Sequence, residues 1–521
     1  MHFDLKFVRL GVRNAYQGLI LLAFLRDCDY NVNIAKKTTN YFHKGRENMI
    51  EQIHGVINAI SGFLYEPYIV PLFLIVAGLY FTARTGLLQI RLFGEAIKVV
   101  NEKPKDKKSV SSFGALMVST ASRVGTGNII GVSTAICTGG FGAIFWMWIT
   151  AILGGASAFI ESTLAQIYKK KDADGTYYGG PSYYMQEALK QRWLGVVFAV
   201  ILILTYVVGY NMLASFNTQD TFKTFSFYDA SRTPLIIGAI LAILFAACVL
   251  GGGKRLTNIT GVLVPIMGLL YIIVSLVVVI MNIDAFPAVI KNIFASAFDF
   301  KAIFGGFAGS CMMWGIKRGL YSNEAGMGSA PNAAASADVS HPVKQGLVQM
   351  LSVFIDTLLI CTATAFMCMC ANPEGLNKDV AGAAYVQNSM QMALGDFGPV
   401  FIAVAMSLFA FTTLIGNYYY TEGCLKFILK RSPSKTFMLI FRLIAIALVF
   451  IGALLSAGIV WDTADMLQAF MVIINVPVII IIAKPALAAL KDYMSQRKQG
   501  KDPVFKASSV GLEGKTDCWE D

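Results

Sequence analysis

The chain has 521 residues, of which 56% are hydrophobic and 14% are charged, whereas soluble domains carry about 25% charged residues. Several apolar runs reach about 20 residues, enough to cross a bilayer, and this excludes a soluble globular protein. The formal net charge is +11, but the basic residues gather in alternate loops, which argues against nucleic acid as their partner.

The first 48 residues differ from the rest. They carry eight basic residues and one apolar run, Gly18–Leu25, that is too short to span a bilayer. Either they follow an upstream start and Met49 is the functional initiator, or they form an extension that lies on the membrane surface. We favour the first interpretation, so residues 1–48 are predicted to be a non-native extension, followed by a first span and a basic loop over 49–112.

Eleven apolar segments are predicted to cross the membrane. They are 67–83, 113–138, 141–167, 194–217, 233–250, 256–281, 303–321, 343–371, 397–425, 437–456 and 464–483. One set of alternate loops, with the tail 484–521, carries 28 Lys and Arg residues, and the opposite set carries 5. The positive-inside rule therefore places the C-terminus in the cytoplasm and, with eleven spans, the N-terminus outside.

The second of these segments is interrupted. Residues 122–131 read SRVGTGNIIG, with Gly125, Gly127 and Gly131 beside Thr126 and Asn128. Backbone that leaves helical geometry at membrane depth is tolerated only where it lines a protein-enclosed or watery cavity, and secondary transporters place their ligands at such breaks. Helix packing through small residues is the alternative explanation, but it accounts less well for the two polar side chains.

Without the first span, ten helices remain and divide into two repeats of five, residues 113–281 and 282–483. The first helix of the second repeat, 303–321, contains GGFAGS over Gly305–Ser310, which we take as the counterpart of the first interruption. Packing alone explains this second motif about as well. The expected fold is an all-α polytopic membrane protein with a five-plus-five, LeuT-like inverted-repeat core.

The two ends exposed by a broken helix indicate which charged groups the ligand carries. Free amide N–H groups at the start of one half-helix attract a carboxylate, and carbonyl groups at the end of the other suit an ammonium group or Na⁺. A zwitterionic amino acid satisfies both ends. The many Gly, Ala and Ser residues around the breaks favour a small side chain.

The predicted span 397–425 contains Thr412, Thr413 and Asn417. Helical spacing puts Thr413 and Asn417 one turn apart on one face. Hydroxyl oxygens are suitable ligands for Na⁺, although threonines in membrane helices often only bond the carbonyl one turn back.

Charged residues inside the spans are the remaining candidates, because such groups face the bundle interior and mark function. Arg123 and Glu161 form either a structural ion pair or inner-gate latch, or they contact the ligand. Asp356 is either a protonatable or ion-linked carboxylate or is satisfied by neighbouring hydroxyls. Lys317 and Arg318 are expected at the cytoplasmic end of the second broken helix. The four histidines form no metal motif, and the scattered cysteines are expected to be core thiols.

Four stretches resemble the alanine or glycine:cation symporter family of the amino acid–polyamine–organocation superfamily. They are GTGNIIGVSTAICTGGFGAIFWMW (125–148), IKRGLYSNEAGMGSAPNAAASA (316–337), HPVKQG (341–346) and FAFTTLIGNYYYTE (409–422), and the resemblance extends over about residues 49–490. It implies Na⁺-coupled uptake of alanine or glycine, with substrate contacts at Thr126, Gly127, Asn128, Thr413 and Asn417. Many members have Trp where this chain has Asn417, so serine or glutamine is also a possible substrate.

The sequence therefore predicts a carrier and not an enzyme, with no cofactor and Na⁺ as the coupling ion, in a prokaryotic plasma membrane. The predicted substrate site comprises Thr126, Gly127, Asn128, Gly309, Thr413 and Asn417. The predicted sodium ligands are Gly125, Thr412 and Thr413, and Arg123, Glu161 and Asp356 are predicted to serve gating or coupling. Coupling to H⁺ through Asp356, broader specificity and a channel are the alternatives.

Overall fold

A computed structural model describes residues 51–65, 69–104, 109–172, 175–299 and 310–520. The chain divides into two compact units, Met1–Ala59 and Ile60–Asp521. In the first unit, residues 51–59 are helical, and the predicted extension 1–48 lies outside the described residues. The second unit holds all the features discussed below.

Apolar composition makes this unit helical, since a helix satisfies every backbone polar group within its own segment. Its helices up to residue 297 are α2 Ile69–Thr85, α3 Leu88–Arg91, α4 Phe93–Val99, α5 Ser112–Arg123, η1 Gly127–Gly131, α6 Val132–Gly139, α7 Gly142–Ile167, α8 Pro181–Glu187, α9 Arg192–Ile203, η2 Leu204–Tyr210, α10 Asn211–Asp220, η3 Thr221–Thr224, α11 Thr233–Val249, α12 Gly253–Met281, η4 Ile283–Ala285 and α13 Phe286–Ala297. The helices that follow are α15 Cys311–Asn323, α16 Pro331–Ser336, α17 Pro342–Val353, η6 Phe354–Cys361, α18 Thr362–Ala371, η7 Lys378–Val380, α19 Ala383–Leu394, α20 Phe397–Leu429, α21 Lys435–Gly452, α22 Ala457–Ile481, α23 Lys484–Lys498 and η8 Ala507–Val510.

Within the described residues, eight helical segments are long and apolar enough to cross a membrane. Every predicted span overlaps a helix. Three of these helical segments, 112–139, α11 and α15, are not long and apolar enough to be counted among the eight. The first is broken and polar, and the other two have 17 and 13 residues. A polytopic helical membrane protein is therefore confirmed, whereas the count of eleven spans stays a prediction.

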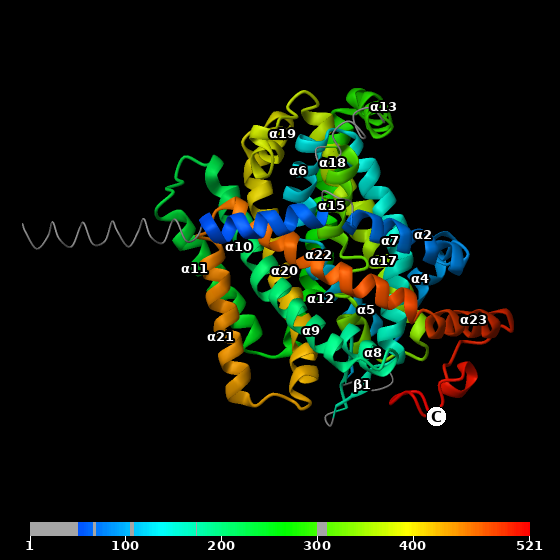
Figure 1. The fold of residues 1–521 in the computed structure, drawn as a ribbon. Helices are drawn as coiled ribbons and strands as arrows, with labels where there is room; N and C mark the ends of the chain where they lie inside the picture. Colours follow the sequence, from blue (N-terminus) through cyan, green and yellow to red (C-terminus); the bar gives the residue numbers. More distant parts are fainter. Residues whose placement is uncertain (1–50, 66–68, 105–108, 173–174, 300–309, 521) are drawn as a thin grey trace, which may run out of the picture. The chain divides into compact units, whose positions relative to one another are not determined.

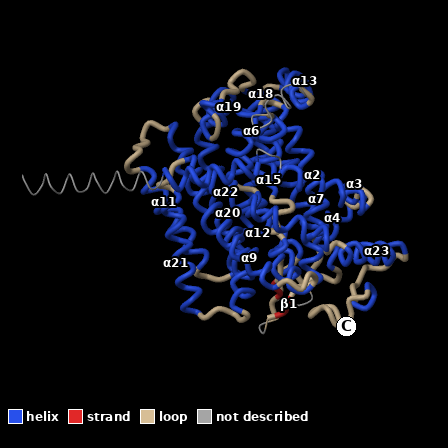
Figure 2. The backbone as a smooth tube through the Cα atoms, in the orientation of Figure 1, coloured by secondary structure: helices blue, strands red, loops and turns tan. Residues whose placement is uncertain are grey.

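The two ends of this unit differ. Figure 1 places α6, α13, α18 and α19 toward one end and α8, β1 and the C-terminus toward the other. The two strands described, β1 (Lys170–Lys171) and β2 (Tyr177–Tyr178), pair antiparallel, with Lys170 opposite Tyr178. Figure 2 shows this hairpin as the red segment in an otherwise helical chain, and we call its side of the unit the β1 end.

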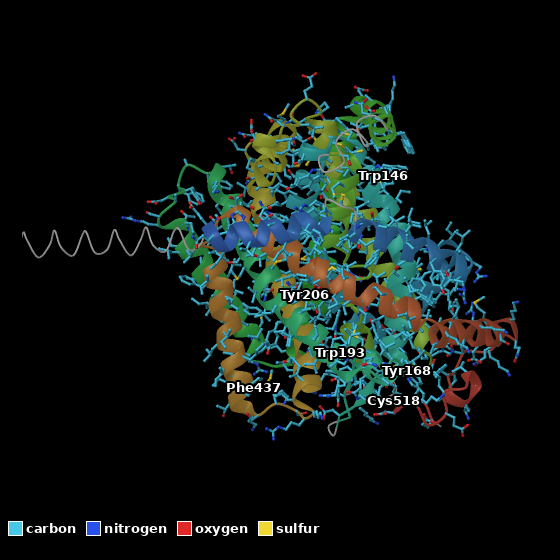
Figure 3. The ribbon with its side chains drawn as sticks, in the orientation of Figure 1. Trp146, Tyr168, Trp193, Tyr206, Phe437 and Cys518 are labelled. Carbon is cyan, nitrogen blue, oxygen red and sulfur yellow. The ribbon has the colours of Figure 1, made fainter. Side chains whose placement is uncertain are left out.

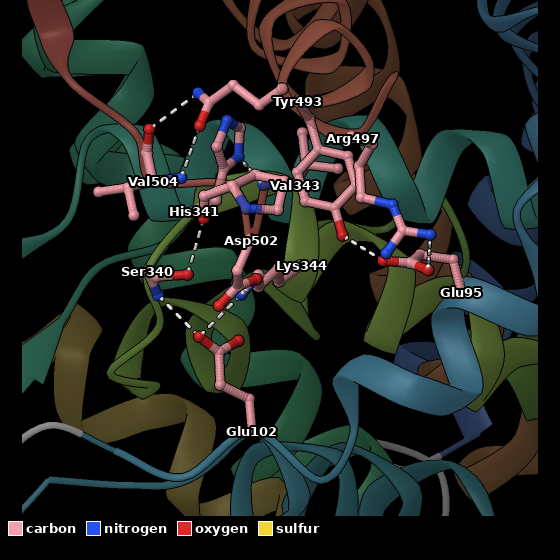
Figure 4. A network of polar contacts seen from close by, with 12 residues as sticks. Glu95, Glu102, Ser340, His341, Val343, Lys344, Tyr493, Arg497, Asp502 and Val504 are labelled. Atoms are coloured by element: carbon pink, nitrogen blue, oxygen red, sulfur yellow. Dashed lines mark hydrogen bonds and ion pairs between the residues drawn. The ribbon is translucent and has the colours of Figure 1, made fainter. Parts of the chain in front are cut away.

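The C-terminal segment packs against the start of α17 (Figure 4). His341 caps this helix by accepting a hydrogen bond from the backbone N–H of Val343 at Nδ1, so its Nε2–H faces Asp492 Oδ2 at 3.3 Å. Burial lowers the pKa of the imidazole. Lys344 Nζ lies 3.1 Å from Glu102 and 2.8 Å from Asp502, which joins the tail to the loop before α5.

Candidate functional site

The first helix break forms where the sequence predicts it. Helix α5 ends at Arg123, and Val124 leaves helical geometry with ψ at 86°. Asn128 Oδ1 then accepts a hydrogen bond from the backbone N–H of Gly125 at 2.8 Å. This bond replaces an intrahelical one, and helical structure resumes with η1 at Gly127. The break is therefore an ordered turn in which the Asn128 side chain satisfies the backbone N–H group three residues before it.

A second break is present in the described residues, C-terminal to the predicted one. The break was expected at Gly305–Ser310, but Gly305 to Gly309 lie outside the described residues and Ser310 caps α15 by accepting from the Met313 N–H. That break therefore stays a prediction, and the described chain leaves helical geometry over 324–330, between α15 and α16. Glu324 has a φ of 55°, and Gly326 and Gly328 have φ of 86° and 82°, a region that glycine tolerates without strain.

Glu161 of α7 holds this second break. Its carboxylate accepts from the backbone N–H groups of Gly326 at 3.4 Å and Gly328 at 3.1 Å, and from Asn475 Nδ2 at 2.9 Å. Asn475 also donates to the Gly326 carbonyl. No described ion pair within 4 Å joins Glu161 to Arg123, so the predicted gate pair is not a direct contact.

We expect Glu161→Gln to destabilise the protein by about 1–3 kcal/mol, because one amide nitrogen would then face a buried donor. The thermal unfolding midpoint of the purified protein measures this. Glu374→Gln, which changes an exposed carboxylate, is the matched control and should leave the midpoint unchanged. An equal midpoint for both variants would remove Glu161 as the support of the break.

Asp356 connects the first break to α15. Its Oδ1 accepts from Asn128 Nδ2 at 2.7 Å, and its Oδ2 accepts from the hydroxyls of Ser322 and Thr357, each at 2.8 Å. Asn128 Nδ2 also lies 3.1 Å from the Asp356 carbonyl. Neighbouring hydroxyls, one of the two predicted alternatives for this carboxylate, are therefore present, from Thr357 beside it and from Ser322 of α15.

Asn417 of α20 belongs to a second polar chain. Its Oδ1 lies 2.7 Å from the hydroxyl oxygen of Ser122, which is also 2.9 Å from Glu324 Oε1. Asn417 Nδ2 donates to Asn211 Oδ1 at 2.9 Å. This chain links α5, the second break, α10 and α20, all through buried groups.

Thr413 faces the first break directly. A Cβ built on Gly125 would stand 2.0 Å from Thr413 Oγ1, so only glycine permits this approach. The Thr413 hydroxyl is buried and has no hydrogen-bond partner in the described structure. Thr412 differs, because its hydroxyl donates to the carbonyls of Leu408 at 3.1 Å and Phe409 at 3.0 Å, one turn back.

Aromatic rings lie on the other side of the first break. The hydroxyls of Thr126 and Tyr321 are 3.0 Å apart, and a Cβ on Gly127 would meet the Tyr321 ring at 3.0 Å. The Tyr321 ring stacks edge-on against Tyr210, with centroids 5.0 Å apart, and against Trp461, with centroids 5.1 Å apart. Side chains from three helices thus enclose the break.

Arg123 is buried beneath both breaks. Its Nη1 donates to the Gln349 carbonyl at 3.3 Å, while its Nε and Nη2 have no partner in the described structure. Its charge acts on three buried carboxylates, Glu161, Glu324 and Asp356. One guanidinium therefore interacts electrostatically with three acidic groups, with no hydrogen bond to any of them among the described residues.

Lys317 and Arg318 form a separate cluster, contrary to their predicted place at a cytoplasmic helix end. They lie within α15, between Cys311, which contacts Ser296 of α13, and the second break. Asp465 of α22 lies 2.7 Å from Lys317 Nζ and 3.0 Å from Arg318 Nη2. We call these three residues the outer cluster, since they lie on the side of the break away from the β1 end.

A cavity of about 790 Å³ opens at the β1 end. Its walls include the start of α5, the hairpin strand β2, and the side chains of Asn332, Tyr419 and Glu422. Asn332 donates to the carbonyl of Ser329, whose hydroxyl donates to Glu324. The cavity therefore approaches the second break from the β1 end.

The structure brings most predicted site residues together. Thr126, Asn128, Asp356, Thr413 and Asn417 all belong to the hydrogen-bonded or closely packed shell around the first break. The sequence analysis missed Ser122, Asn211, Tyr321, Ser322 and Glu324. The last three lie in the stretch 316–337 that carries the family resemblance, so that stretch held a signal for them.

Comparison with known proteins adds an independent finding. The model of the sodium:alanine symporter family matches residues 50–507. The chain is 45% identical to the amino-acid carrier protein AlsT of Bacillus subtilis, over 90% of this chain and 98% of that protein. It is 41% identical to the probable sodium/glutamine symporter GlnT of Bacillus subtilis, over 91% and 97% of the two chains. It is 37% identical to the sodium/alanine symporter AgcS of Methanococcus maripaludis, over 85% and 98%.

Among solved structures, the chain is similar to MhsT in complex with L-phenylalanine, with a TM-score of 0.48 and 14% identity over 81% of this chain and 94% of that one. It is also similar to a manganese transporter of Eremococcus coleocola, with a TM-score of 0.45 and 16% identity over 75% and 80%.

Proposed function

Because the chain belongs to the sodium:alanine symporter family, we propose that it imports a small neutral amino acid, alanine or glycine, together with Na⁺. Amino-acid symport across a membrane follows from the family and its relatives. The coupling ion, the substrate, the five-plus-five repeat and the orientation are our proposals. They rest on the site and on the charge of the loops.

The charge balance of the site is the observation that carries Na⁺ coupling. Arg123 faces three buried carboxylates, and the outer cluster has two basic groups and one carboxylate. With all seven of these groups ionised, the described residues would carry one negative charge in excess. A buried charge without a partner is strongly destabilising, and one Na⁺ carried with a neutral zwitterion would balance it.

The proposed Na⁺ position is between Thr413 and the first break. The Thr413 hydroxyl is a buried oxygen without a partner, and it faces the backbone of Gly125. Na⁺ prefers such hydroxyl and carbonyl oxygens. Thr412, whose hydroxyl is already engaged with two carbonyls, is a weaker candidate for the same shell.

We expect Thr413→Val to weaken Na⁺ activation of uptake at least tenfold while leaving the packing nearly unchanged, since valine has the shape of threonine without its oxygen. Thr412→Val is the matched control one residue away. The measurement is the Na⁺ concentration for half-maximal uptake in proteoliposomes. Unchanged Na⁺ activation in Thr413→Val would exclude it as a ligand.

The substrate is proposed to lie between Thr126 and Asn417, where hydroxyl and amide groups adjoin the two helix breaks. Gly127 and the Tyr321 ring restrict the space beside Thr126, which favours a small side chain. Asn417 is already bonded to Ser122 and Asn211, so a longer polar substrate would have to replace those bonds. Glutamine remains the second candidate because one relative is named a probable glutamine symporter.

Alternating access would connect this site to each side in turn. The cavity at the β1 end, which carries the basic loops, corresponds to the cytoplasmic path, and the outer cluster closes the opposite path. One Na⁺ crossing about 100 mV gives ~2.3 kcal/mol. A tenfold gradient adds about 1.4 kcal/mol, so the total sustains a several-hundredfold accumulation of substrate.

The deciding experiment is uptake of radiolabelled alanine into proteoliposomes with a Na⁺ gradient and a pH gradient imposed separately. We expect accumulation under the Na⁺ gradient alone. Accumulation under the pH gradient alone would assign the coupling to H⁺. Proton coupling is a specific alternative because one relative is named a sodium/proton-dependent alanine carrier protein. Equilibration without accumulation under either gradient would indicate a channel.

A further inference from the structure

A second cavity, of about 690 Å³, lies where the start of α9 meets the end of α20. Its size is within the roughly 300–1,000 Å³ of small-molecule sites. Among the described residues that line it, one is a carboxylate, Asp172, and five are basic: Lys170, Arg192, Lys426, Lys430 and Arg431. We call this cavity the basic pocket.

Two of the five basic groups already have acidic partners. Lys426 Nζ lies 2.5 Å from Asp172 Oδ2, and Lys170 Nζ lies 2.8 Å from Asp517 and 3.1 Å from Glu187. The first pair joins the hairpin to α20, and the Lys170 pairs join the hairpin to the tail and to α8. The other three basic residues of the pocket are not part of these pairs.

Arg192, Lys430 and Arg431 have no carboxylate partner among the described residues. The Arg192 guanidinium is held in place by neutral acceptors, the Phe427 carbonyl at 2.8 Å and Gln186 Oε1 at 2.6 Å. Lys430 and Arg431 are exposed at the end of α20. Three positive charges directed at one cavity favour an anionic ligand, and planar guanidinium groups suit phosphate oxygens in particular.

The basic pocket lies at the level where lipid contact begins. On α9, the residue after Arg192 is Trp193, whose side chain is 64% exposed, and the exposed face continues along the helix through Val197, Val200 and Leu204. This spacing of four, three and four residues is one apolar face of a helix. Exposed tryptophan at the start of such a face marks the membrane interface.

Helix α21, which starts four residues after the lining residue Arg431, repeats this arrangement. It begins at Lys435, and its exposed apolar face starts at Phe437 and continues through Ile440 and Ile444. Figure 3 labels Trp193 and Phe437 in the lower half of the view, toward the β1 end. Two lipid-facing surfaces therefore start beside one basic cavity.

We propose that the basic pocket binds the phosphodiester headgroup of an anionic phospholipid. A soluble phosphate offers the same chemistry, but the adjoining faces of α9 and α21 supply a surface for acyl chains that a soluble anion cannot use. Basic pockets between membrane helices on the positive side are known to hold such headgroups. The pocket shares Tyr178 and Lys426 with the cavity near Asn332, so a bound headgroup lies against the wall of that cavity.

The test is equilibrium binding of fluorescent phosphatidylglycerol to the purified full chain in neutral detergent, with phosphatidylcholine as the neutral lipid. The variant is the double substitution Lys430→Gln and Arg431→Gln. The matched control is Lys498→Gln with Lys501→Gln, which removes two exposed charges from the region after α22. Glycerol 3-phosphate serves as a soluble competitor.

We expect saturable binding of phosphatidylglycerol that is about thirtyfold weaker in the variant, from about fivefold per basic side chain near the surface. The control should bind as the unchanged protein does, and glycerol 3-phosphate should not displace the lipid. Equal affinity for the two lipids, or equal affinity in variant and control, would overturn the proposal. Displacement by millimolar glycerol 3-phosphate would assign the pocket to a soluble anion instead. All substituted side chains are exposed, and size-exclusion profiles check the fold.

Discussion

Gly125→Ala is expected to abolish amino-acid uptake in proteoliposomes. The added Cβ would stand 2.0 Å from Thr413 Oγ1, a distance that real Cβ atoms do not show, and 3.2 Å from Thr413 Cβ, which is tight enough to require a small shift. Turning the hydroxyl aside would relieve only the first contact, so α20 and the first break must move apart. A displacement of about 1 Å in a reacting site costs on the order of a hundredfold in rate, and we expect a loss of that size here.

The control for this substitution is Gly261→Ala. Gly261 is also in a membrane helix, and a Cβ there would meet no atom within 4 Å. Uptake should therefore be unaffected, and replacing a helical glycine should if anything stabilise α12. Gly125→Ala with normal uptake would mean that Thr413 does not press against the break.

A second variant separates packing from ligand binding. Combining Gly125→Ala with Thr413→Ala removes both Thr413 atoms beyond Cβ and so relieves most of the overlap. If the loss came from packing alone, the double variant would recover uptake. We expect it to stay inactive and to lack Na⁺ activation, because the hydroxyl that faces the break is then missing.

Asp356→Asn is expected to reduce uptake by about a hundredfold or more. The carboxylate accepts three hydrogen bonds at two oxygens, and an amide offers only one acceptor atom, so its NH₂ group would face a donor. Each buried donor left without an acceptor costs about 1–3 kcal/mol, and every 1.4 kcal/mol is tenfold in an equilibrium. Both Asn128 and Ser322 would lose their position.

Two measurements distinguish the roles of Asp356. Net uptake driven by a gradient needs ion coupling, whereas exchange of labelled for unlabelled alanine needs only binding and the conformational change. We expect Asp356→Asn to lose both, since the carboxylate positions the first break. Loss of net uptake with normal exchange would instead show that Asp356 carries the coupling ion or proton, contrary to the positioning role. Thr357→Val, which removes one of its three donors, should have a smaller effect.

The first break could be found from the sequence because its cause is local. Glycines within an apolar run, followed three residues after Gly125 by an asparagine, supply both the freedom to leave the helix and the side chain that holds the turn. The membrane spans could be predicted for the same reason, because the hydropathy of each segment depends only on its own residues. The predicted spans 256–281 and 397–425 thus agree closely with α12 (Gly253–Met281) and α20 (Phe397–Leu429).

The second break could not be placed in this way. Glycine density predicted a break at Gly305–Ser310, of which 305–309 lie outside the described residues. It did not predict the break over 324–330, where Glu161 supplies acceptors for the N–H groups of Gly326 and Gly328. That carboxylate is 165 residues away in sequence, in α7. A single sequence shows where a backbone is free to leave a helix, but not which distant side chain satisfies it.

By itself, then, the sequence determined a polytopic helical carrier with a break at Gly125, and its motifs indicated the family. Only the tertiary structure decided that Glu161 supports the second break, that Lys317 and Arg318 pair with Asp465, and that Thr413 rather than Thr412 has a free hydroxyl. The reason is physical: apolar burial is encoded residue by residue, whereas buried charges and donors are satisfied by partners that only packing brings within reach.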